Sequence, residues 1–169
     1  MISTARTTGP IGRVRSTAAS EEPAMEPPTA KDTLARGAET HESHRLPGTL
    51  ASAIKARRLV GDFLDRLQHT RLAEAAALAI SEIVTNAVTH GRPPVHLDLT
   101  WLIGDTPTLR VDVHDHGHVT LHSVASETAD EAESGRGLFI VENVTDRWGL
   151  TPHPVHGTHA WFEIEAAAA

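Results

Sequence analysis

The sequence predicts an α/β fold of the two-layer sandwich type, with one mixed, mostly antiparallel sheet and its helices on one face. Two observations predict it. Residues 49–67 and 71–90 carry apolar side chains at helical spacing. From residue 95 onward, segments alternate apolar and polar residues, as half-buried strands do. The resulting order is two helices, a hairpin, a loop, a helix and a closing hairpin. This order favours helices packed against a single sheet.

Composition limits the class of protein. A chain of 169 residues is long enough to bury a core as one domain. The absence of cysteine excludes disulfides, thiolate nucleophiles and thiolate zinc sites. The net charge of −7 argues against a nucleic-acid surface. No continuous apolar run approaches the roughly 20 residues that span a bilayer, and no secretory signal is recognisable at the N-terminus. We therefore expect a cytoplasmic protein that contacts neither membrane nor nucleic acid.

Residues 1–42 differ in composition from the remainder of the chain. They are rich in Ser, Thr, Ala, Pro and Glu and carry few large apolar side chains. Burial therefore cannot offset the entropy cost of ordering them. We expect a disordered tail at 1–42 and one folded domain at 43–166. The first element of this domain is predicted to be a short strand or turn at 44–48, where Pro47 disfavours a central position in a sheet.

The two N-terminal helices are predicted from their apolar periodicity. The first spans 49–67, and the second spans 71–90 and ends beside Gly91, a residue type suited to helix termination. The apolar side chains that follow the helical period are Leu50, Ile54, Ala56, Leu59, Val60, Phe63, Leu64 and Leu67 in the first helix, and Leu78, Ile80, Ile83, Val84, Ala87 and Val88 in the second.

A β-hairpin is predicted after the second helix. Residues 92–94 read Arg-Pro-Pro and cannot continue a helix. Segments 95–103 and 109–115 then alternate apolar and polar side chains, and the sequence GDTP lies between them. Two such strands around a short turn form a hairpin.

The C-terminal third is predicted to hold a loop, a helix and two strands. Residues 117–134 lack periodicity and include the acidic run ETADEAES, so we expect a long functional loop. A helix opened by glycines follows at 135–147. Strands at 148–151 and 158–165 close the domain.

The second helix carries the first candidate chemistry. Glu82, Asn86 and His90 recur every four residues and therefore share one edge of the helix. A carboxylate and a carboxamide one turn apart can hold a hydrated hard cation and an attacking hydroxyl together. The alternative is an ordinary amphipathic helix with a solvated polar edge.

Three further stretches add to this edge. Asp115, two residues before Gly117 at a strand end, can accept a hydrogen bond from an exocyclic amine such as that of adenine, and the glycine lets a flat ring approach the backbone. Ser134-Gly135-Arg136-Gly137 introduces a helix, where backbone amides and Arg136 suit phosphate oxygens. Thr158, after Gly157, can reach the same pocket. The alternatives are a strand-to-loop turn, a glycine hinge with an ordinary cap, and a plain turn.

The order E-x-x-x-N, D-x-G, G-x-G and G-T in these contexts resembles the GHKL (Bergerat) ATPase and kinase superfamily. The segments LAISEIVTNAVTHG, VDVHDHG, SGRGLFIVENVTDRWGL and GTHAWFEI most resemble anti-sigma factor serine kinases of the RsbW and SpoIIAB type. The resemblance covers about residues 45–165. It implies the Bergerat fold, ATP and Mg²⁺ as cofactors, and a homodimer. It also implies a sigma factor and a STAS-type anti-anti-sigma protein as partners.

The resemblance also implies roles for the matched residues. Asn86 would coordinate Mg²⁺, and Glu82 would be the general base toward a partner's serine hydroxyl. Asp115 would bind the adenine amine, with Gly117 beneath the ring and Thr158 assisting. A further set would wrap the phosphates: Gly135, Arg136 and Gly137.

The chain departs from the kinase members at one charged position. Glu133 stands where those members carry an arginine that holds the terminal phosphate. A non-catalytic nucleotide-binding module that sequesters a partner is therefore the alternative. A histidine metal site formed by His114, His116 and His118 is a second, weaker one. A sensor histidine kinase is disfavoured because no long helical hairpin with a phosphoacceptor histidine is predicted.

Overall fold

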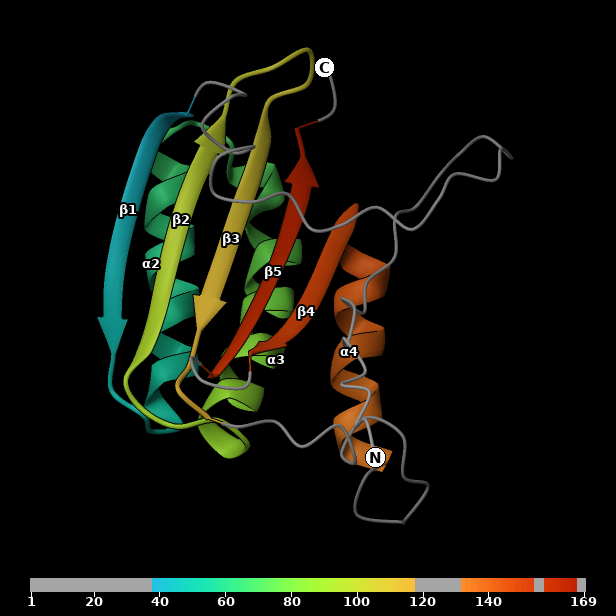
Figure 1. The fold of residues 1–169 in the computed structure, drawn as a ribbon. Coiled ribbons are helices and arrows are strands. Elements are labelled where there is room, and N and C mark those ends of the chain that lie inside the picture. Colours follow the sequence, from blue (N-terminus) through green and yellow to red (C-terminus); the bar gives the residue numbers. More distant parts are fainter. Residues whose placement is uncertain (1–37, 118–131, 154–156, 167–169) are drawn as a thin grey trace, which may run out of the picture.

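The computed structural model describes residues 38–117, 132–153 and 157–166. They form a five-stranded sheet in the order β1-β2-β3-β5-β4 and three α-helices (Figure 1). The elements in chain order are β1 (Ala38–Leu46), α2 (Ala51–Arg66), the 3-10 helix η1 (Thr70–Leu72), α3 (Ala73–Thr89), β2 (Val95–Leu102), β3 (Thr108–His114), α4 (Ala132–Val144), β4 (Arg147–His153) and β5 (Gly157–Glu165).

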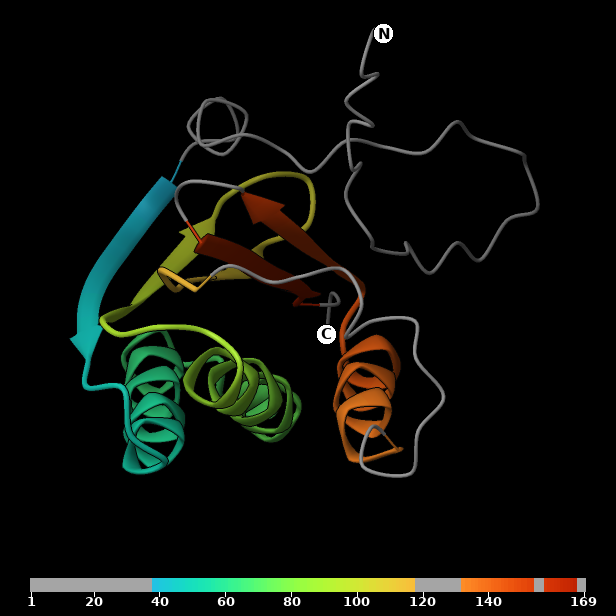
Figure 2. The ribbon, with the colours of Figure 1, turned by 60° about the horizontal axis from the view of Figure 1, so that its bottom comes forward.

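All three helices lie on one face of the sheet, with α3 between α2 and α4 (Figure 2). The predicted α/β sandwich is thus confirmed. The expected mixed pairing is not seen among the described strands, because all four of their pairings are antiparallel. The reason is topological. β5 inserts between β3 and β4, so these two strands, which run in the same direction, are not neighbours.

The core lies between the sheet and the helices. Alternate residues of each central strand face the helices, as the strand period requires. Buried strand residues include Leu97, Leu99, Val111 and Phe162, and helix residues that meet them include Phe63, Ile80, Val84 and Ala87. Each large apolar side chain buried in this way contributes roughly 1.5–3 kcal/mol.

Helix α3 is the central helix of this layer. Together with η1 it spans Thr70–Thr89, which has a mean hydropathy of 1.3 and is long and apolar enough by composition to cross a membrane. In this fold the same apolar side chains pack on the sheet and on the neighbouring helices α2 and α4. The segment therefore has the character of a core helix.

β1 begins earlier than the sequence predicts. The expected strand was limited to 44–48, within a domain starting at 43, whereas β1 pairs with β2 from Ala38 to Leu46. Its sequence, AETHESHRL, is largely polar. Backbone pairing and cross-strand contacts stabilise it, such as Ser43 Oγ donating to Asp98 Oδ1 at 2.5 Å. An edge strand needs little apolar burial, so hydrophobicity did not reveal it. The predicted tail at 1–37 lies outside the described residues.

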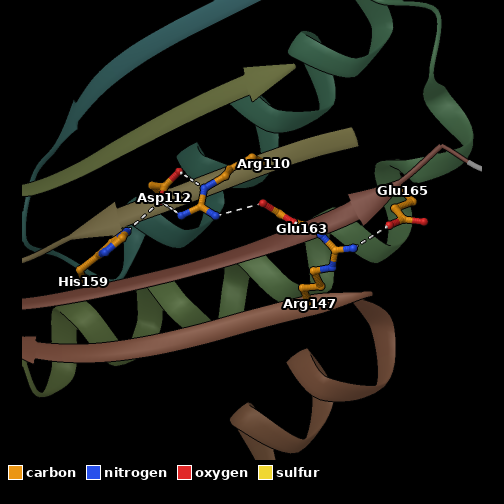
Figure 3. Close-up of polar contacts among 6 residues, drawn as sticks. All are labelled: Arg110, Asp112, Arg147, His159, Glu163 and Glu165. Carbon is orange, nitrogen blue, oxygen red and sulfur yellow. Dashed lines mark hydrogen bonds and ion pairs between the residues drawn. The ribbon is translucent and has the colours of Figure 1, made fainter. Parts of the chain in front are cut away.

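The sheet face opposite the helices, called here the outer face, carries an ionic network (Figure 3). The guanidinium of Arg110 donates to both carboxylate oxygens of Asp112, at 2.9 and 2.7 Å, and to Glu163 at 3.0 Å. It also lies 4.4 Å from the centroid of the Trp161 ring. Arg147 extends the network from β4, 3.4 Å from Glu163. Arg110 and Glu163 are each only 2% exposed.

The charges of this network hold one another in the ionised form. Burial disfavours the charge on Arg110, but Asp112 and Glu163 outweigh it and raise the arginine pKa. Burial likewise opposes ionisation of Asp112, yet His159 and Arg110 outweigh it, and the pKa of this carboxyl is lowered. The stabilising ionisation of Asp112 is therefore present at neutral pH and lost only in acid.

We predict that Arg110→Met lowers the free energy of unfolding by about 3–5 kcal/mol, because the carboxylates of Asp112 and Glu163 lose the buried guanidinium that they share. Urea titration at pH 7 measures the loss. Arg57→Met, which removes an exposed arginine of α2, is the matched control and is expected to change stability by about 0.5 kcal/mol or less. Equal stability of the two variants would contradict a structural role for the network.

Candidate functional site

The site centres on Asp115, which follows β3 and is only 4% exposed. Its carboxylate accepts a hydrogen bond from the Gly117 amide at 2.6 Å, and backbone groups of Arg92 and Thr158 also bond to it. Its own amide donates to the Thr158 carbonyl at 3.0 Å. The residue thereby joins the end of β3, the start of β5 and the α3–β2 connection.

Glycines surround Asp115 where a larger residue would collide. A Cβ atom on Gly91 would lie 2.5 Å from the Asp115 Cγ, and one on Gly117 would lie 2.9 Å from the Arg92 amide nitrogen. Gly157 has φ +90°, and a Cβ there would overlap the Asp115 carbonyl oxygen. The three glycines let three backbone segments converge on one carboxylate.

Thr158 supplies the second polar group of the site. The residue is 6% exposed, and its hydroxyl oxygen is buried without a hydrogen-bond partner among the described residues. A buried hydroxyl without a partner costs free energy, because it has given up its bonds to water. A ligand that hydrogen bonds to Thr158 would recover that cost.

Burial also sets the charge state of Asp115. It raises the pKa of the carboxyl, although backbone hydrogen bonds from Gly117, Arg92 and Thr158 oppose the change. The folded protein therefore holds the carboxyl proton more tightly than the unfolded chain does. The contribution of this group to stability is complete below pH 3.8 and is lost as the pH rises through the folded pKa. At neutral pH, the buried, ionised carboxyl of Asp115 therefore lowers the stability of the fold.

The polar edge of α3 leads toward this site. Glu82 and Asn86 are partly exposed and lie one turn apart on α3, about 6 Å along its axis. The helix ends at Thr89, and Gly91 follows in contact with Asp115. The structure therefore brings Asp115, Gly117 and Thr158 together, with Asn86 and Glu82 on successive turns leading away from them. His90 is exposed at the end of α3.

The start of α4 differs from the prediction. A helix was expected from Gly135, but α4 begins at Ala132 and continues through Gly135, Arg136 and Gly137. Within a helix, the amide of Gly137 donates to the carbonyl four residues earlier and is not free for a phosphate. Only the first amides of α4 remain available. The alanine and acidic residues preceding the glycines have adequate helix propensity, which accounts for the earlier start. The side chains of Glu133 and Arg136 lie outside the described residues.

Gly137 instead packs against the candidate base. A Cβ atom on Gly137 would lie 2.8 Å from the Glu82 Oε2. A bulkier residue would displace the Glu82 carboxylate. The glycine therefore allows α4 to lie directly beside this part of α3.

Sequence reasoning missed one part of the site. Gly91 was assigned only to helix termination, although it also touches Asp115 and Gly117. The Gly157 backbone against Asp115 was likewise not foreseen. These contacts join residues distant in sequence, so no local pattern contains them. The predicted loop at 117–134 is described only at its ends.

A buried carboxylate, an unpartnered hydroxyl and convergent glycines fit the edge of a purine, with glycine backbone against its flat face. Fold and site together are those of an α/β domain suited to a purine nucleotide. The model of the histidine kinase-like ATPase domain family matches residues 46–162. The chain belongs to this family and is an ATP-binding domain.

A solved structure gives a further comparison. The histidine kinase domain from the Erythrobacter litoralis EL346 blue-light activated histidine kinase is 17% identical to this chain, with a TM-score of 0.42. The alignment covers 68% of this chain and 59% of that domain. This chain therefore spans less than two thirds of the matched protein. No curated protein matches the sequence.

The histidine metal alternative finds no support in the described residues. His116 stacks on His96 with ring centroids 5.8 Å apart, and His114 stacks on His159. The part of the chain that the structure describes contains no group of three His, Cys, Asp or Glu residues suited to a metal ion. His118 lies outside it.

We predict that Asp115→Asn abolishes binding of an ATP analogue and makes the protein more stable than the wild type at pH 7. Asparagine replaces a buried charge with a neutral group of the same shape. The stability difference should shrink as the pH falls through the raised pKa of the folded carboxyl and should be smallest below 3.8. Thermal unfolding across pH and calorimetric titration measure both effects. The assignment would be contradicted if the stability of the variant relative to the wild type were lower at pH 7 than at pH 4.

Gly157→Ala is expected to lower the free energy of unfolding by about 2 kcal/mol or more, because alanine disfavours positive φ and its Cβ overlaps Asp115. Gly61→Ala is the matched control. Gly61 lies in α2 with nothing within 4 Å of the new Cβ, so alanine should add up to about 1 kcal/mol there. Urea titration compares the two variants. Equal effects would contradict a backbone constraint at Gly157.

Proposed function

We propose that this ATP-binding domain is a protein serine/threonine kinase of the anti-sigma type. It would phosphorylate a serine of a STAS-type anti-anti-sigma protein and sequester a sigma factor. The observation that carries the proposal is the polar edge of α3, where Glu82 and Asn86 occupy successive turns that lead to Asp115. The partners and a homodimeric state rest on the sequence resemblance alone, and a cytoplasmic location rests on composition alone.

Each residue has one role in this proposal. Asp115 and Thr158 bind the adenine edge. The carboxamide oxygen of Asn86 is a hard ligand of the kind that Mg²⁺ prefers. Mg²⁺, when bound, neutralises charge on the phosphates. Glu82 accepts the proton of the serine hydroxyl as that oxygen bonds to the γ-phosphorus, and ADP leaves with the electrons of the broken bond.

The helices of the described chain support a protein substrate over a phosphohistidine relay within the domain. Helices α2, α3 and α4 contain no histidine. None of them therefore offers the phosphoacceptor that a sensor histidine kinase carries on a helix. In this proposal the acceptor hydroxyl belongs to another protein.

One contact favours a second candidate, a non-catalytic module that binds nucleotide and sequesters its partner. Gly137 lies against the Glu82 carboxylate, and α4 remains helical through the glycine motif. In this arrangement the base is partly covered by α4. Sequestration requires only the nucleotide site and a docking surface, whereas transfer requires Glu82 to reach a hydroxyl.

Phosphotransfer separates the two candidates. We expect Glu82→Ala to retain binding of an ATP analogue and to lose transfer of labelled γ-phosphate to a STAS protein by about a hundredfold or more. Asn86→Ala should lose the magnesium-dependent part of binding. Glu74→Ala, at the exposed start of α3, is the control for both measurements. Unimpaired phosphate transfer by Glu82→Ala would show that Glu82 is not the general base. Wild-type binding without transfer would establish the sequestration module.

A further inference from the structure

Three histidines form a row across the outer face of the sheet. His96 of β2 is the register partner of His114 in β3, and His114 is the register partner of His159 in β5. Successive strand residues point to opposite faces. Asp115 and Thr158, which are adjacent in sequence to His114 and His159, therefore face the other side, toward the nucleotide pocket.

Two of these histidines form a parallel stack. The rings of His114 and His159 lie 4.2 Å apart with an angle of 8° between their planes. Stacking keeps water away from the facing sides of both rings, so burial disfavours the charged form of His114. His159 is also tied to the ionic network: its Nε2 donates to Asp112 Oδ1 at 2.8 Å (Figure 3). Arg110 holds Asp112 from the opposite side.

The stack lies on the final paired rung of the β3–β5 ladder. His114 and His159 are the last partners in register, and the next contact is the hydrogen bond from the Asp115 amide to the Thr158 carbonyl. That bond joins the two residues that bind the adenine edge. Separation of the rings would open the ladder where it holds Asp115 and Thr158 together.

We propose that the stacked pair of His114 and His159 is a positioning element of the nucleotide site, which closes the last rung of the ladder and releases it when His114 is protonated. The proposal rests on the nucleotide site at Asp115 and Thr158. It adds that adenine affinity depends on the charge of His114, a residue that does not face the ligand.

The electrostatic surroundings give the direction of the effect. Burial, and then the charge of His159, lower the pKa of His114. His96 acts in the same direction, whereas Asp112 and Asp98 oppose it. The stabilising neutral form of His114 is thus present at pH 7 and is lost as the pH falls below 6.5 through the folded pKa. The remaining charged groups around the row are Arg110 on β3, Arg45 on β1 and Glu163 on β5, together with His116 beyond β3.

The test measures ADP affinity by calorimetry at pH 7.5 and pH 5.5. The wild type should bind about tenfold more weakly at pH 5.5, the factor that one pKa unit of coupling corresponds to. His114→Gln cannot gain a charge, so its ratio of affinities should be flat apart from the titration of ADP, which is common to all variants. His114→Arg carries a permanent charge and should bind weakly at both pH values. His41→Gln, an exposed histidine of β1 outside the row, should keep the wild-type ratio.

A second readout needs no ligand. Amide hydrogen exchange of Asp115, expressed as a protection factor, reports the opening of the rung directly. We expect at least tenfold lower protection at pH 5.5 in the wild type and no such loss in His114→Gln. Equal acid loss of affinity in the wild type and His114→Gln overturns the proposal, as does a loss of protection without a loss of affinity. Absence of ADP binding by the wild type at pH 7.5 instead refutes the nucleotide site itself.

Discussion

The carboxylate of Asp115 is the contact on which the site depends. It draws backbone groups of Arg92, Gly117 and Thr158 to one point, and each of these residues belongs to a different segment of the chain. The convergence is sterically possible because glycine stands at three positions around it. Burial of this charge opposes folding, since it raises the carboxyl pKa. A carboxylate retained against its own desolvation is typical of a functional site.

The two faces of the sheet have different physical tasks. The face toward the helices buries apolar side chains, and Asp115 and Thr158 lie at its end. The outer face holds Arg110, Asp112 and Glu163 in a buried network that is costly to break. His159 connects this network to the β3–β5 ladder one residue from Thr158. The outer face thus stabilises the same strand ends that carry Asp115 and Thr158 on the inner face.

The sequence predicted what local patterns encode. The helices on either side of residue 70 and the hairpin of β2 and β3 matched their apolar periods closely, because those elements bury one regular face. The predicted starts of β1 and α4 were wrong. β1 is polar and held by backbone pairing, and glycines suggested a helix start where α4 is already helical. In both cases the local signal was weaker than the tertiary or helical context that overrode it.

By itself, the sequence determined the fold class and the polar edge of Glu82 and Asn86 on α3, and it predicts Asp115 as the acid of the site. These features depend on spacing within one element or at its end. Only the tertiary structure decided that Gly91 and Gly157 enclose Asp115, that Gly137 lies against Glu82, and that His114 stacks on His159. Such contacts join residues far apart in the chain. Their geometry follows from strand order and helix packing, which no local spacing specifies.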